Sequence, residues 1–182
     1  MTTVLSLFCW TSDLTWAHLN DSFLVLIRMS KTNLLTEEHL AWIGHEDKPL
    51  TVEISQRDII KYSVATEQQQ EKYLAGREAP PMFIFNIFAQ PKPLDQLRVD
   101  GLARGTGDGP SLPLKRVMAG GKNVQFFRPI RPGETLTGIN RIKNIYEKNG
   151  AQGPLIFTER QLEVTNQDGQ PVFTETETSI AR

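Results

Sequence analysis

The sequence predicts an α+β domain in which a long antiparallel sheet wraps around a central apolar helix. The most apolar window of the chain, residues 79–88, enters through Pro80-Pro81, and a double proline suits the first turn of a helix. This helix would be apolar on every side and therefore buried on every side, although a buried strand also fits its aromatic content. The second half of the chain divides into segments of alternating polarity that predict strands. These segments are residues 115–127, 134–147, 154–165 and 171–180.

Length and charge restrict the class of protein. A chain of 182 residues corresponds to one domain. Its 20 basic and 21 acidic residues argue against a nucleic-acid binder, which normally carries a basic excess. Cys9 is the single cysteine, so neither an internal disulfide framework nor a multi-thiolate zinc site is expected. The apolar run at residues 23–27 is far shorter than the roughly 20 residues of a membrane span, and a cytoplasmic protein is expected.

Residues 1–33 read as an N-terminal extension, and the domain proper is expected over residues 34–182. The first basic residue of the chain is Arg28, and polar residues interrupt the apolar stretch, so the segment lacks the features of a secretory signal. Two interpretations stay open. The segment is either an additional amphipathic arm, or Met29 is the true start of the protein.

The domain is predicted to begin with short elements. Thr36-Glu37-Glu38 opens a helix that stops at Gly44, and residues 48–54 alternate like a strand behind Pro49. Ser55 caps the next helix, which ends near Ala65. Residues 66–72 are entirely polar and predict a solvated loop or helix face. The Pro- and Gly-rich residues 91–113 predict a loop, because their glycines do not follow a strand as a phosphate-binding loop would.

Turn signals separate the predicted strands. Arg131-Pro132-Gly133, Asn149-Gly150 and Gln167-Asp168-Gly169 are each typical of tight turns, and Asn-Gly and Asp-Gly favour two-residue hairpins. The last three strands should therefore form an antiparallel meander.

The residues alone show no convincing catalytic constellation. His18, His39 and His45 do not have the spacing of metal ligands, and His39 beside Trp42 reads as a structural residue. Cys9 has no partner for nucleophilic catalysis, and no metal or cofactor is predicted. The paired acids are interpreted as surface residues that favour solubility and protect strand edges. These pairs are Glu159 with Glu163 and Glu175 with Glu177.

The order of elements and one long motif carry a resemblance. The residues concerned are Gly120, Gly121, Phe126, Phe127, the block Arg128-Pro129-Ile130-Arg131-Pro132-Gly133-Glu134-Thr135-Leu136, Tyr146-Glu147-Lys148, Gly153-Pro154-Leu155 and Asn166-Gln167-Asp168-Gly169-Gln170. With them, residues 34–182 resemble the N-terminal, non-catalytic-type half of the MaoC-like acyl-thioester dehydratases and hydratases. The resemblance implies a hot-dog fold and a hydro-lyase acting on 2-enoyl or 3-hydroxyacyl thioesters of CoA or acyl-carrier protein.

The active half of that family carries an Asp-x-Asn-Pro-x-His motif whose Asp and His activate water. Laid on this chain, the motif falls on Gln68, Gln70, Glu71 and Tyr73, and a glutamine cannot take up a proton near neutral pH. The resemblance therefore implies a subunit without the catalytic pair, which joins a second hot-dog domain edge to edge as a homodimer or heterodimer. Glu67 and Tyr73 are the remaining candidates if this half is catalytic.

Gly120 and Gly121 are the candidate substrate-binding residues, because glycine lets a thioester or pantetheine approach the backbone closely. A β-bulge is the structural alternative for this pair. Two other functions stay open for the whole chain: a non-enzymatic acyl-CoA-binding module, and a self-sufficient homodimeric hydratase that uses Glu67 and Tyr73. A thioesterase is disfavoured, because residues 80–90 contain no acid.

Overall fold

The computed structural model describes residues 33–182 except 86, 90 and 102–108. Residues 34–182 form one compact unit. The predicted extension thus lies outside the described residues apart from Asn33, and so do Cys9, His18 and most of the glycine-rich run. The elements are α2 (Glu37–Leu40), β1 (Leu50–Glu53), α3 (Gln56–Ala65), α4 (Glu71–Leu74), the 3-10 helices η1 (Pro81–Ile84) and η2 (Leu94–Gln96), β2 (Val117–Phe126), β3 (Thr135–Gly150), β4 (Gly153–Asn166) and β5 (Pro171–Ala181).

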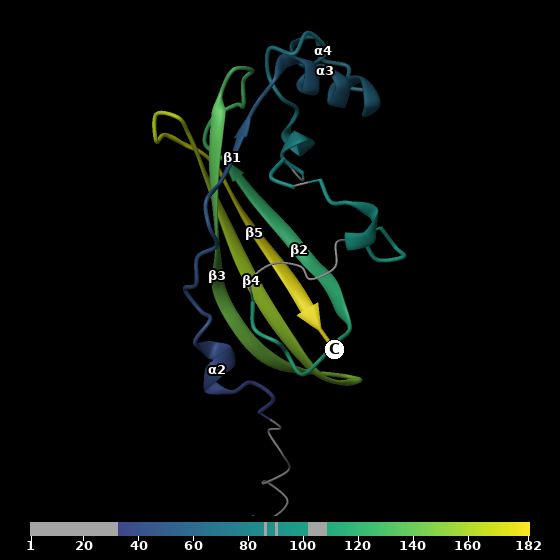
Figure 1. Cartoon of the computed structure of the whole chain (residues 1–182), viewed down its shortest axis with the longest axis vertical. Coiled ribbons are helices and arrows are strands. Elements are labelled where there is room, and N and C mark those ends of the chain that lie inside the picture. Colours follow the sequence, from purple (N-terminus) through teal and green to yellow (C-terminus); the bar gives the residue numbers. More distant parts are fainter. Residues whose placement is uncertain (1–32, 86, 90, 102–108) are drawn as a thin grey trace, which may run out of the picture. The chain divides into compact units, whose positions relative to one another are not determined.

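The five strands form one antiparallel sheet in the order β1-β3-β4-β5-β2. Strands β3, β4 and β5 are the predicted meander, which is confirmed, and Figure 1 shows these long strands side by side with β2 along β5. The two edges of the sheet are the short β1 and the long β2. Both edge strands precede the meander in sequence, and β2 lies next to β5, the last strand of the chain, and not next to β3, which follows it.

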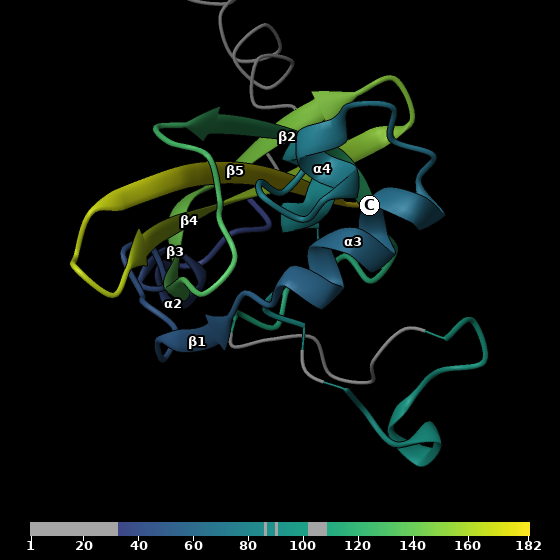
Figure 2. The same cartoon turned by 90° about the horizontal axis from the view of Figure 1, so that it is seen from above.

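The first helices form where the sequence predicts them. Ser55 Oγ accepts a hydrogen bond from the backbone N–H of Asp58 at 3.0 Å and donates one to the Asp58 carboxylate at 2.7 Å, which caps α3. Helix α2 begins after Thr36, whose backbone N–H donates to His39 Nδ1 at 2.9 Å, so His39 has the structural role expected of it. Figure 2, the view from above, shows α3 and α4 close together. None of the described helices reaches the length and apolarity needed to cross a membrane.

Two of the three predicted turns lie where the sequence places them, and the third does not. Gly133 and Gly169 take positive φ angles of 82° and 73° in the predicted turns. The prediction of Asn149-Gly150 as a hairpin turn was wrong, because Gly150 still pairs with Gly153 and the two-residue loop is Ala151-Gln152. The loop lies two residues later because glycines flank it, and Gly153 supplies the positive φ of 120°.

The apolar window covers the sheet as expected but is not a long helix. Its helical part is η1, four residues of 3-10 helix, and Phe85 already has an extended ψ of 113°. Only one side of η1 is covered: Phe83 and Ile84 are buried, whereas Met82 and Phe85 are more than half exposed. A helix that is apolar on every side has to be packed against other residues on every side. In this fold η1 is packed on one side only.

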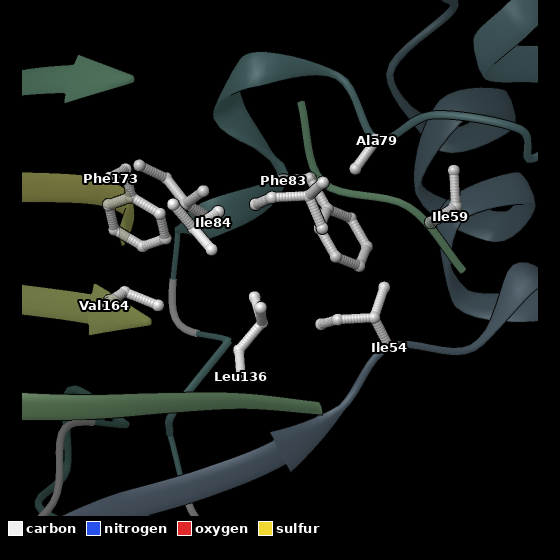
Figure 3. Close-up of a cluster of buried hydrophobic side chains, with 10 residues drawn as sticks. Ile54, Ile59, Ala79, Phe83, Ile84, Leu136, Val164 and Phe173 are labelled. Atoms are coloured by element: carbon white, nitrogen blue, oxygen red, sulfur yellow. The ribbon is translucent and has the colours of Figure 1, made fainter. Parts of the chain in front are cut away.

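The buried side chains form two clusters. The first joins η1 and α3 to the sheet, and Figure 3 shows Phe83 and Ile84 facing Leu136, Val164 and Phe173 across this core. The second lies nearer the far ends of the strands and contains Leu35, Ile142, Ile145, Ile156 and Ala181. We call the sheet face that carries both clusters the inner face.

Candidate functional site

A band of polar residues separates the two apolar clusters of the inner face. Along β4 and β5 the paired residues of this face change from Val164 with Phe173 to Arg160 with Glu177, and then to Ile156 with Ala181. On this one face, the residues of the strands are thus apolar near both ends and charged in the middle. We call the residues in the middle the polar band; they are Asp47, Lys122, Asn140, Arg160, Glu175 and Glu177.

One side of the polar band is a lysine held by two glutamates. Lys122 Nζ lies 2.6 Å from Glu175 Oε1 and 3.4 Å from Glu177 Oε2. Burial works to lower the pKa of the Lys122 ammonium, but its hydrogen bond with Glu175 and the two negative charges outweigh burial, so this pKa is raised. The expectation that Glu175 is a surface residue was wrong, since Glu175 is only 8% exposed. It faces inward because it shares a strand face with Phe173, two residues away.

The other side of the polar band is built around Asp47. Asp47 Oδ2 accepts a hydrogen bond from Asn140 Nδ2 at 2.8 Å and lies 3.5 Å from a guanidinium nitrogen of Arg160. Asp47 Oδ1 is shut off from solvent and has no hydrogen-bond donor among the described residues. An unpaired buried carboxylate oxygen costs free energy, so the contacts of Asp47 Oδ2 with Asn140 and Arg160 are what stabilise this carboxylate.

A cavity of about 220 Å³ lies over the inner face beside the polar band. Its apolar wall includes Phe88, Leu50, Gly138 and Leu162, and its polar wall consists of residues of the band together with Lys48. The Phe88 ring lies directly on Gly138: a Cβ atom built at residue 138 would come 2.8 Å from Phe88 Cζ. We call this space the inner cavity.

A second cavity, of about 390 Å³, lies between α4 and the end of β2. Tyr73, a candidate from the sequence, lines it and is only 7% exposed. Lys72 Nζ lies 4.7 Å from the centre of the Tyr73 ring and 2.6 Å from Glu78, another lining residue. Phe126 and Phe127 line the opposite side. We call this space the end cavity.

The Arg-Pro-Ile-Arg-Pro-Gly-Glu block shapes the floor of the end cavity. Its last residue, Glu134, binds the Arg128 guanidinium, and its second carboxylate oxygen accepts a hydrogen bond from the Arg131 backbone at 2.9 Å. Ile130 between them is buried, and its carbonyl accepts a hydrogen bond from the Ala79 backbone at 2.9 Å. The block is therefore a rigid connection between β2 and β3.

Glu67, the other catalytic candidate, does not join Tyr73 in a cavity. It is exposed just after α3, where its φ angle of 53° lies in the left-handed region, and it lines neither the inner nor the end cavity. The structure therefore brings Tyr73 to a cavity and leaves Glu67 on the surface.

Gly120 and Gly121 lie in β2 and form a β-bulge against β5. The register slips there, with Ala119 opposite Ser179 and Gly121 opposite Thr178. A Cβ atom at Gly120 would come 3.0 Å from the Thr178 carbonyl oxygen, whereas one at Gly121 would meet nothing within 4 Å. The bulge is the structural alternative considered above, and the open space at Gly121 is where close approach by a ligand is sterically free.

The inner cavity is the functional feature that sequence reasoning missed. The signal was present in the strand period, since Glu175 and Glu177 share a face with Phe173. What could not be read from the sequence is that Asp47, which precedes β1, lies next to Arg160 of β4.

Comparisons with known proteins place this geometry in context. A family model described as the FAS1-like dehydratase domain region matches residues 41–175. Mesaconyl-C(4)-CoA hydratase from Chloroflexus aurantiacus is 30% identical over 118 residues, which make up 65% of this chain and 42% of the hydratase. The chain therefore spans less than half the length of this curated relative.

Solved structures of low sequence identity share the fold. The ChsH1-ChsH2 complex from Mycobacterium tuberculosis contains a chain that matches with a TM-score of 0.59 and 16% identity, over 84% of this chain and 92% of that one. A MaoC-like dehydratase from Phytophthora capsici matches with a TM-score of 0.56 and 19% identity, over 81% of this chain and 50% of that one.

Proposed function

The chain belongs to the FAS1-like dehydratase-region family and has the MaoC-like hot-dog fold. From this premise we propose that it is the non-catalytic half of a (3R)-hydroxyacyl-thioester dehydratase or 2-enoyl-CoA hydratase. In this role it supplies a wall of the acyl pocket. A second hot-dog domain supplies the Asp and His that activate water. The substrate is an acyl thioester of CoA or of acyl-carrier protein.

The observation that carries the proposal is the missing acid–base pair. Addition of water to an enoyl thioester needs two titratable groups that face one reacting carbon. The positions of the family motif hold glutamines at 68 and 70, and its last position is the buried Tyr73. Two histidines lie in the described part of the chain, His39 and His45, and neither lines the inner or the end cavity.

Both histidines are held by structural contacts. His39 binds the N-terminus of α2 through Nδ1, and its Nε2 lies 3.2 Å from the Ser111 carbonyl oxygen. The His45 ring packs edge-on against Trp42, with 4.7 Å between the ring centres. These contacts support a structural role for both residues.

The edge strand β2 supports pairing with a second hot-dog domain. Nine of its ten residues are exposed, and it pairs with β5 on one side only. Natural edge strands usually carry charges or proline against unwanted pairing, but the only charged residue in β2 is Lys122, which the two glutamates of β5 hold. An edge without this protection favours a permanent partner strand.

The lengths of the relatives also support a second domain. This chain covers 42% of the Chloroflexus hydratase and 50% of the Phytophthora dehydratase chain. Each relative therefore has room for a further region of similar size. One of the similar structures is a complex of two different chains, which is the arrangement proposed here.

Hydration of crotonyl-CoA tests the proposal, with loss of the enoyl thioester absorbance as the readout. The full-length chain alone should show no turnover. Mixing it with the product of a neighbouring gene that carries the Asp/His motif should give turnover above that of either protein alone. Glu67→Gln and Tyr73→Phe in this chain should leave the rate of the mixture within about twofold, because neither group transfers a proton.

Turnover by the lone chain that Glu67→Gln or Tyr73→Phe abolishes would contradict the proposal and favour a self-sufficient hydratase. Circular dichroism of each variant would show that the fold is intact. Saturable binding of acyl-CoA, without any rate in the presence of the partner, would instead favour a binding module.

A further inference from the structure

Phe88 forms part of the wall of the inner cavity. This ring packs against the first apolar cluster and lies against the backbone of β3 at Gly138. The φ angle of Gly138 is outside the left-handed region, so close neighbours rather than the backbone favour a glycine there: the Phe88 ring first, and Leu162 Cδ1 at 3.1 Å. A side chain as small as alanine at 138 would meet two atoms of the ring within 3 Å. The Phe88 ring therefore packs directly on the backbone of Gly138, and we call Gly138 the seat of this ring.

Another part of the wall of the inner cavity is charged. Asp47, Arg160 and Glu177 line it, and the charged groups of Asp47 and Arg160 lie 3.5 Å apart. A methyl or methylene group that displaced water from these groups would leave them poorly solvated, which costs free energy. This charged part of the wall therefore opposes an apolar chain, even where space exists.

The inner cavity is small. At about 220 Å³, the inner cavity is somewhat larger than an engineered apolar cavity of about 150 Å³ that binds one benzene ring. Scaled from that six-carbon ring, an acyl chain of about six to eight carbons fills a space of this order. A longer chain meets Phe88 on Gly138, meets the polar band or leaves the cavity for solvent, and none of these places adds an apolar contact.

We infer that Phe88, seated on Gly138, restricts the acyl group of the substrate to a short chain, so that the substrate class is the short-chain acyl thioesters. This inference rests on the proposed function, because it takes the inner cavity as part of the acyl pocket. It names a specificity-determining residue that transfers no proton and that the sequence did not single out.

Binding by the full-length chain tests the inference by isothermal titration calorimetry with free CoA, butyryl-CoA and decanoyl-CoA. Butyryl-CoA should bind at least about tenfold more tightly than decanoyl-CoA, and more tightly than free CoA. Phe88→Ala should reduce the preference for butyryl-CoA by about tenfold, mainly by tighter binding of decanoyl-CoA. Phe127→Ala is the matched control, because it removes an equal ring outside the inner cavity and should leave the preference unchanged.

A second variant tests the seat without removing the ring. Gly138→Ala should push the ring off β3 into the cavity and weaken butyryl-CoA binding by about fivefold. The double variant Phe88→Ala with Gly138→Ala should recover most of that loss, because the new methyl group then has room. Phe88→Leu, which keeps most of the packing, replaces Phe88→Ala if circular dichroism shows that the smaller residue unfolds the chain.

The outcomes separate the inference from the proposed function. Equal binding of butyryl-CoA and decanoyl-CoA, unchanged by Phe88→Ala, overturns the inference and leaves the proposed function in place. Binding of free CoA as tight as that of butyryl-CoA also overturns the inference, since the acyl group then lies outside the cavity. A third outcome is that no thioester binds and that no mixture with a partner turns over a CoA ester. In that case the proposed function fails, and the inference fails with it.

Discussion

The carboxylate of Glu134 binds the guanidinium of Arg128 at the point where β2 leaves the sheet and the chain turns toward β3. The side chains are 10% and 24% exposed, so the pair is largely removed from water. Glu134 also accepts a hydrogen bond from the Arg131 backbone, which ties the turn to the ion pair. The motif that carries the family resemblance is therefore a structural connection with a buried charge pair inside it.

Removal of one partner of this pair should destabilise the domain. We expect Glu134→Ala to lower the free energy of unfolding by about 3 kcal/mol, because Arg128 then stays buried without a counter-charge. Glu46→Ala is the matched control: its pair with Arg141 is 2.6 Å long but half exposed, and its loss should cost less than about 1 kcal/mol. Denaturation in urea, followed by circular dichroism, measures both, and equal losses would contradict the assignment.

The cap of α3 gives a second stability prediction. Ser55→Ala removes the acceptor of the Asp58 N–H and should cost about 1 kcal/mol of the free energy of unfolding. Ser55→Asp keeps an acceptor at the same position and should stay within a few tenths of a kcal/mol of the wild type. A Ser55→Ala protein with unchanged stability would show that α3 does not depend on this cap.

The lysine of the polar band predicts a loss of stability at high pH. Because the pKa of Lys122 is raised above the ordinary 10.5, its contribution is fully present below that pH and is lost as the pH rises through the raised pKa. The difference in the free energy of unfolding between wild type and Lys122→Met should therefore be constant below about pH 10 and shrink as the pH rises above it. Lys143→Met, at an exposed position of β3, serves as the control and should show no such change.

The open edge of β2 predicts how the partner binds. Asn123→Lys combined with Gln125→Lys places two charges along this strand and should weaken assembly with the second hot-dog domain by at least about tenfold. Thr51→Lys in β1, at the other edge of the sheet, should leave assembly unchanged. Sedimentation velocity of the mixtures measures the effect. A loss of assembly caused by the β1 variant alone would contradict the prediction and place the interface at β1.

Local patterns predicted most of the fold. The Ser55 cap, the turns at Gly133 and Gly169 and the meander of β3, β4 and β5 depend on residues close together in the sequence, and all are confirmed. The resemblance to MaoC-like proteins is confirmed as well. The family motif could be recognised because it is contiguous.

The features that the sequence did not predict depend on contacts between residues far apart in the chain. The extent of the helix in residues 79–88 depends on how much of its surface the sheet covers, and the sheet covers Phe83 and Ile84 only. The strand period places Glu175 on the face of Phe173, but the counter-charge that pairs with it there, Lys122, lies on another strand. The inner cavity depends in the same way on Phe88 and Gly138, whose contact no local pattern indicates.

The strand order has a consequence for synthesis of the chain. The first two strands that leave the ribosome, β1 and β2, lie at opposite edges of the sheet and do not pair with each other. Strand β1 pairs only when β3 has followed, and β2 waits for β5 at the end of the domain. No part of the sheet can therefore form until β3 is made, and the edge proposed for the partner is completed last. A nascent chain stalled before β5 leaves β2 unpaired on both sides, which is the state most exposed to aggregation.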